Sequence, residues 1–211
     1  ELDAFGANNY THITGQLVIG TRYELDFSDI TDLSSLTSLI SIGENLFIAG
    51  NENLANLNGL HNLEYVGSHL NIFDNPSLTS LAELNKLKTV TMDFNIYQNQ
   101  ILSNLDGLAI KHIGGRLNIN YNPSLTNIQG LSELVTVGAI KINNNPKLAS
   151  LKGFENITEV SALSISNNNV LPNMEGLENL TQISDYLSIN YCNLFTNLDE
   201  LQNVSSSTAE I

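Results

Sequence analysis

The sequence predicts a mainly β solenoid, in which the chain winds into about eight stacked coils of 23–24 residues. Three observations predict it: a fixed period, apolar residues that keep their place in the period, and an asparagine that recurs at one position. The apolar residue that opens the period recurs at intervals of 29, 24, 24, 23, 23, 23 and 24 residues, at Leu17, Leu46, Leu70, Phe94, Leu117, Ile140, Leu163 and Leu187. A period in the twenties is typical of a solenoid with one coil per repeat.

Each coil is expected to begin with a short strand. Two residues after the opening residue stands an isoleucine in every repeat: Ile19, Ile48, Ile72, Ile96, Ile119, Ile142, Ile165 and Ile189. An apolar residue, any residue and a β-branched apolar residue form the pattern of a strand whose alternate side chains point inward. One such strand in each coil predicts a parallel sheet along one side of the solenoid.

The rest of each coil shows apolar residues spaced by three, such as Leu125, Ile128 and Leu131. This spacing predicts a tight helical turn or a second extended side, because a long helix would need a 3.6-residue pattern over a longer stretch.

Five positions after the opening residue stands an asparagine, which Cys192 replaces in the last coil: Asn51, Asn75, Asn99, Asn122, Asn145 and Asn168. A turn in every coil leaves backbone groups that face inward without partners, and a buried amide can both donate to them and accept from them. We therefore expect the amides to stack into a ladder. A free thiol packs as a small apolar group, so Cys192 fits the same column.

The period divides the chain into three parts. Residues 1–16 are predicted to cap the first coil, residues 17–204 to form one solenoid, and the serine-rich residues 205–211 to form a C-terminal linker or tail. Arg22 stands where later coils place asparagine, so the ladder is expected to begin one coil late. Because the chain begins with Glu1 instead of methionine, we expect a processed product or a piece of a longer one.

Composition disfavours several functional classes. The net charge is −14, from 22 acidic and 8 basic residues, which argues against nucleic acid and anionic membranes as partners. The sequence shows no transmembrane stretch, no phosphate loop and no nucleophile elbow. Four histidines without metal spacing and a single cysteine predict no metal site. We expect no catalytic residues, no cofactor and no enzyme activity.

The repeat unit, L-x-I-x-x-N-x-x-L-x-x-L-x-G-L, resembles leucine-rich repeats. It is more similar to the receptor L domain, the β-helix-like solenoid of insulin-receptor-type ectodomains. Ile13 to Gly20, followed by Asp29 to Leu33, resembles the opening of such domains. The resemblance covers about residues 12–204 and is closest to secreted surface proteins of Bacteroidetes-type bacteria, since a single cysteine cannot form the disulfides usual in animal receptors. It implies a right-handed solenoid and an extracellular or cell-surface module for recognition or adhesion.

Aromatic residues on consecutive coils indicate where a ligand would bind. Reading the strand pattern outward gives Phe47, Phe73, Tyr97 and Tyr121, and the polar residues just before the strands are His69, Asp93 and Arg116. Between the two inward residues of three strands lie Asn71, Asn95 and Asn118. Exposed aromatic rings with polar neighbours suit a protein or carbohydrate partner. The alternative is that the rings turn inward or stack on one another to stabilise the solenoid.

Two other functions stay open. The solenoid could serve as a structural spacer or stalk of a larger surface protein, as its repeats and serine-rich tail suit. It could also be a β-helix enzyme acting on polysaccharides, with His69, Asp93 and Arg116 on adjacent coils. One isolated acid does not form the carboxylate pair of a glycosidase, however.

Overall fold

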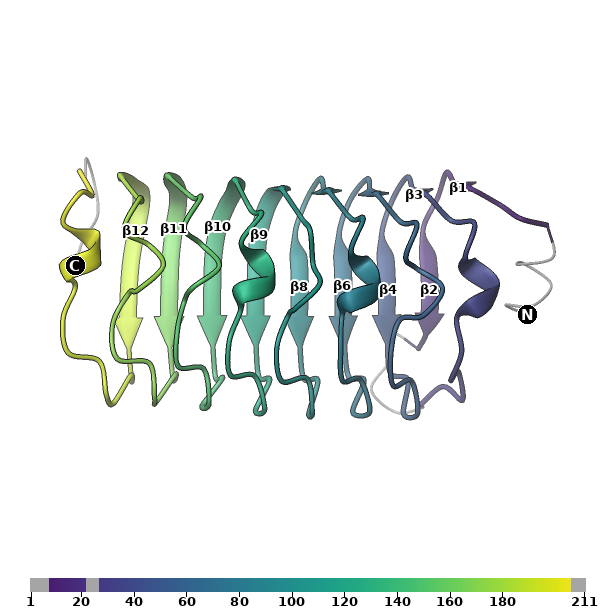
Figure 1. The fold of residues 1–211 in the computed structure, drawn as a ribbon, viewed down its shortest axis with the longest axis horizontal. Coiled ribbons are helices and arrows are strands. Elements are labelled where there is room, and N and C mark those ends of the chain that lie inside the picture. Colours follow the sequence, from purple (N-terminus) through teal and green to yellow (C-terminus); the bar gives the residue numbers. More distant parts are fainter. Residues whose placement is uncertain (1–7, 22–26, 206–211) are drawn as a thin grey trace.

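The computed structural model describes residues 8–21 and 27–205. Figure 1 shows an elongated solenoid whose coils lie side by side along the long axis, with the first and last described coils at opposite ends. Residues 1–7 of the predicted cap, Arg22, and residues 206–211 of the predicted tail lie outside the described residues.

The long side of the solenoid is a parallel sheet. Its eight described strands are β2 (Leu17–Gly20), β4 (Leu46–Ala49), β6 (Leu70–Phe73), β8 (Phe94–Tyr97), β9 (His112–Asn120), β10 (Thr136–Asn143), β11 (Glu159–Ser166) and β12 (Gln182–Asn190). Each predicted opening residue and its isoleucine lie in one of them. The register aligns equivalent positions, so that Leu70 lies opposite both Leu46 and Phe94. The predicted parallel sheet is therefore confirmed.

In the first four coils of the sheet, a second and shorter strand comes before the long strand in the sequence, and these short strands form a row of their own. It contains β1 (His12–Ile13), β3 (Ser41–Ile42), β5 (Tyr65–Val66) and β7 (Thr89–Val90), which pair in parallel in that order. The row continues into the first residues of β9, because Thr89 pairs with His112. From β9 onward the two strands of a coil join into one, with register shifts between Val137 and Ala139 and between Val160 and Ala162. In the earlier coils a bend separates them.

The apolar residues that are spaced by three in the sequence lie in two structures, the tight turns described next and the short strands of the second row. Four coils form a 3-10 helix: η1 (Ser34–Leu36), η2 (Ala82–Leu84), η3 (Gln129–Leu131) and η4 (Asp199–Leu201). The other coils place a glycine with positive φ in the middle of the same turn, such as Gly59 at 121° and Gly153 at 122°. A Cβ atom on Gly59 would also lie 1.9 Å from the carbonyl oxygen of Leu33 in the preceding coil. Both the backbone conformation and the close approach therefore require glycine there.

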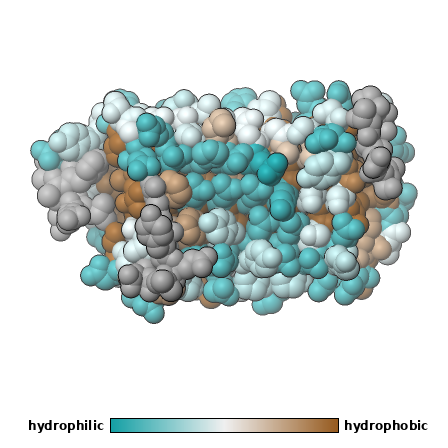
Figure 2. All heavy atoms as spheres, turned by 180° about the vertical axis from the view of Figure 1, so that it is seen from behind, coloured by the Kyte–Doolittle hydropathy of each residue, from teal (hydrophilic) through white to brown (hydrophobic). Residues whose placement is uncertain are grey.

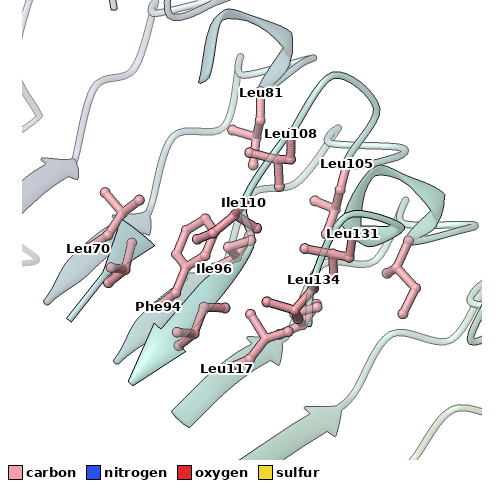
Figure 3. Packing of buried hydrophobic residues seen from close by; sticks show 14 of the residues in the cluster. Leu70, Leu81, Phe94, Ile96, Leu105, Leu108, Ile110, Leu117, Leu131 and Leu134 are labelled. Atoms are coloured by element: carbon pink, nitrogen blue, oxygen red, sulfur yellow. The ribbon is translucent and has the colours of Figure 1, made fainter. Parts of the chain in front are cut away.

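The core is one continuous column of aliphatic side chains. Leu70, Phe94, Leu117 and their equivalents are fully buried, and Figure 3 shows these side chains and those of the opposite turns pointing into the same interior. Each coil alone would expose one face of this core, so the coils stabilise one another by stacking. In the last coil the inward residues Leu187 and Ile189 are only partly buried, because β12 has no strand beyond it in the described part of the chain.

The predicted asparagine ladder is present and is fully buried. From Asn75 onward, the Oδ1 atom of each asparagine accepts from the backbone N–H of the asparagine one coil earlier; Asn122 N–H to Asn145 Oδ1 is 3.0 Å. The Nδ2 group of Asn122 donates to Ile96 O of the preceding coil at 3.0 Å and to Asn120 O of its own strand at 3.1 Å. From Asn75 onward, each side chain thus links three backbone groups from two coils.

The two ends of the ladder differ from its middle. Asn51 Oδ1 is buried and has no hydrogen-bond partner among the described residues. At the other end, Cys192 Sγ donates to Asn190 O at 3.5 Å, which replaces one of the bonds that an asparagine makes. The thiol offers no amide oxygen to the N–H of Asn168. The ladder therefore ends one coil before the last strand.

Replacing Asn122 with alanine is expected to lower the free energy of unfolding by about 3 kcal/mol, because several buried backbone groups lose their partner at once. Urea unfolding followed by far-ultraviolet circular dichroism measures the change. The control is Asn58→Ala, since Asn58 is an exposed asparagine. Equal destabilisation by the two substitutions would contradict the role assigned to the ladder.

Replacing Cys192 with asparagine is expected to extend the ladder and to raise the free energy of unfolding by about 1 kcal/mol, since the Asn168 N–H gains an acceptor. Cys192→Ser removes the thiol without supplying an amide and is the matched control. The same unfolding experiment compares them. A variant with asparagine that is no more stable than the serine variant would show that the ladder cannot be extended.

Candidate ligand-binding face

The outward face of the long strands is the candidate site. Figure 1 views the solenoid from the side of the 3-10 turns, with the long strands behind them, so Figure 2 looks onto the strands. Hydrophilic residues run across the middle of this face, and hydrophobic residues gather towards its ends. The face is therefore polar where β6, β8 and β9 lie.

A row of three amides crosses these strands. Asn71, Asn95 and Asn118 occupy equivalent positions in the register and are half-buried. Asn95 Nδ2 donates to Asn71 Oδ1 at 2.8 Å, and Asn118 Nδ2 donates to Asn95 Oδ1 at 2.6 Å. The bonds all run in the same direction, so they fix the orientation of every amide in the row. The structure thus brings together the three asparagines predicted as ligand contacts.

Two of the four predicted aromatic residues stack on each other. The rings of Phe73 and Tyr97 lie 4.6 Å apart between centroids, with 5° between their planes. Phe73 is only 9% exposed and Tyr97 is half-buried. The alternative in which rings stack to stabilise the solenoid therefore describes this pair, and it leaves one edge of the stack accessible at Tyr97.

The other two aromatic residues lie elsewhere. Phe47 pairs in the register with Asn71, so it continues the amide row towards the N-terminus. Tyr121 follows the end of β9, where its φ of 56° turns the chain, and it is 58% exposed. The sequence analysis had grouped three neighbouring positions of the repeat into one outward face, and Tyr121 occupies the one that lies beyond the last strand residue.

The polar residues before the strands form hydrogen bonds at the bend between the two strand rows. Asn45 Oδ1 accepts from the N–H of His69 at 3.1 Å, and His69 Nδ1 accepts from the N–H of Asp93 at 3.2 Å. Asp93 Oδ1 in turn accepts from the N–H of Arg116 at 2.7 Å. Each side chain thus satisfies the backbone of the next coil, and the Arg116 side chain is exposed.

His69 also lies beside a carboxylate of the next coil. Asp93 Oδ2 lies 3.6 Å from His69 Nδ1. The predicted polar flank of the binding face therefore also has a structural role at the bend.

The sequence analysis did not predict the conformation of the residues that directly precede the ladder positions. The residue directly before each ladder position has a left-handed backbone, with φ between 52° and 57°, at Asp74, Gln98, Tyr121, Asn144, Asn167 and Tyr191. Asparagine tolerates this conformation, but tyrosine and glutamine adopt it at a cost of about 1–2 kcal/mol. Gly50 occupies the same position with φ of 63°. Glycine and asparagine are the residues that most readily adopt a positive φ, and their presence in this column was the sequence signal for the left-handed turn.

Within the described ranges, no group of three histidine, cysteine, aspartate or glutamate side chains could hold a metal ion. The same ranges contain no helix with the length and apolar character needed to span a bilayer.

The chain matches one family model. Residues 9–102 match the receptor L domain. Searches of the curated proteins and of the solved structures gave no significant match. Receptor L domains are non-enzymatic binding domains and are typically extracellular. The match over residues 9–102 and the stacked parallel strands together fit a receptor L domain-like solenoid.

Proposed function

We propose that the chain is a noncatalytic recognition or adhesion module, at a cell surface or outside the cell, that binds a protein or carbohydrate through the outward face of β4, β6, β8 and β9. The observation that carries the proposal is the oriented amide row at Asn71, Asn95 and Asn118. An asparagine amide has two N–H groups and two acceptor lone pairs, so the bonds within the row leave capacity for a ligand.

The neighbouring side chains add apolar surface to this polar row. Phe47 continues it on β4, and the accessible part of Tyr97 lies one column away. Aromatic surface beside oriented hydrogen-bonding groups is the combination found at recognition sites. Successive strands repeat the pattern about every 4.8 Å, which suits a ligand that runs across the strands.

The charge of the chain supports the choice of partner. A net charge of −14 repels nucleic acid and anionic lipid, and it favours partners that are neutral or basic on the contacting side. We therefore propose neither nucleic acid nor an anionic membrane as a partner.

The spacer and enzyme hypotheses make different predictions. A spacer needs no ligand, and an enzyme of the β-helix type would release cleaved polysaccharide. A binding experiment that also inspects the products separates the three hypotheses.

Replacing both Asn71 and Asn118 with alanine is expected to weaken ligand binding at least tenfold, because the row loses its outer amides and its fixed orientation. The wild type is first screened on an array of glycans and surface proteins, and the affinity for each hit is then measured by surface plasmon resonance. Phe73 is unsuitable as a probe, since it is almost buried and its removal would disturb the fold.

The control is Gln129→Ala, an exposed residue on the η3 turn, away from the strands. Hits that survive the double substitution with unchanged affinity would move the site to another surface. Absence of any hit for the wild type would favour the spacer, and cleaved glycan would favour the enzyme.

A further inference from the structure

We propose that the corner of the solenoid, just beyond the ends of the long strands, contains a second binding site whose ligand is an uncharged carbohydrate chain. The site is a different surface from the strand face, and the inference goes beyond the function proposed above. Failure of either proposal leaves the other standing.

The corner carries a shallow groove of about 540 Å³ that runs along four consecutive coils. One wall is the left-handed column described above, at Gln98, Tyr121, Asn144 and Asn167. The other wall stands two residues later in each coil and has Gln100 and Asn169 at its ends, with two prolines between them. The buried asparagine ladder lies between the two walls in sequence and holds the corner rigid.

The lining contains no charged side chain. It consists of glutamine, asparagine, proline and one tyrosine, on a protein whose net charge is −14. Phosphate, carboxylate or a basic peptide would be recognised by charged groups of opposite sign. A peptide that binds through apolar anchors would need hydrophobic pockets. Uncharged amides along a groove instead match the hydroxyl groups of a sugar, because each amide both donates and accepts.

Tyr121 supplies the apolar part of such a site. Its side chain is 58% exposed and gains little from burial, although its backbone adopts a conformation that tyrosine disfavours. The turn of the coil requires this conformation, and glycine or asparagine would adopt it more easily than tyrosine, so the fold alone does not account for a tyrosine here. An exposed tyrosine ring presents an apolar face and a polar edge, which suits the C–H face and the hydroxyl groups of a sugar ring.

Tyr121 borders two hollows. Gln98, Tyr121 and Asn144 also line a second hollow of about 330 Å³, which includes the strand residue Lys141. These three residues thus lie between the groove and the strand face. The equivalent positions repeat about every 4.8 Å, so four coils span about 14 Å, a length that accommodates a short oligosaccharide.

The test uses Tyr121→Gly in the full 211-residue chain. Glycine removes the ring and also adopts the left-handed conformation without strain, so the substitution is expected to leave the unfolding midpoint unchanged or higher. Tyr191→Gly is the matched control, because Tyr191 has φ of 55° at the same corner position but does not line the groove. The probes are neutral oligosaccharides of glucose, mannose and N-acetylglucosamine, titrated by NMR and isothermal calorimetry, with oligogalacturonate and a basic peptide alongside.

The wild type is expected to bind at least one neutral oligosaccharide, Tyr121→Gly to weaken that binding at least tenfold, and Tyr191→Gly to leave it unchanged. The Asn71→Ala/Asn118→Ala variant is expected to retain it, which separates this site from the strand face. The inference is overturned if the wild type binds none of the neutral sugars, if it binds only oligogalacturonate or the peptide, or if the two glycine variants bind equally well.

Discussion

The chain turns sharply at the end of each long strand, and in six coils a buried asparagine of the ladder stabilises that turn. The corner residue takes a left-handed conformation, and the next residue is the buried asparagine. Its side chain bonds to the carbonyl group two residues earlier, as Asn122 does to Asn120 O, and so closes the turn within its own strand. The same amide accepts from the preceding coil, as Asn145 Oδ1 does from the Asn122 N–H. Local turn and coil-to-coil contact are therefore fixed by one side chain.

The surface features follow from this constraint. Because the ladder holds successive coils in register, a residue type at one position becomes a row on the surface. The amide row at Asn71, Asn95 and Asn118 is one result, and the groove beside Tyr121 is another. Side chains also link successive coils at the bend before the long strands, where His69 and Asp93 each accept a hydrogen bond from a backbone N–H of the next coil. A ligand would thus meet rows of groups at a spacing set by the sheet.

The sequence was sufficient to predict the solenoid, the parallel strands and the ladder, because each depends only on periodic burial. It was less informative about the surface. The direction of an outward side chain depends on where the strand ends, so Tyr121 points from the corner instead of joining Phe73 and Tyr97. The stacking of those two rings depends on side-chain angles that no pattern encodes. His69 was predicted only as a candidate ligand contact, because the bend that gives it a backbone partner was not expected.

Native-state hydrogen exchange of the ladder's backbone amides measures whether the ladder holds successive coils together. The amides of Asn75, Asn99, Asn122 and Asn145 each donate to an amide oxygen of the next coil, and they should exchange only through opening of the solenoid. The Asn168 amide faces Cys192, which offers no amide oxygen, and should exchange much faster. Equal protection of all five amides would contradict the account, because coil stacking would then not depend on the ladder.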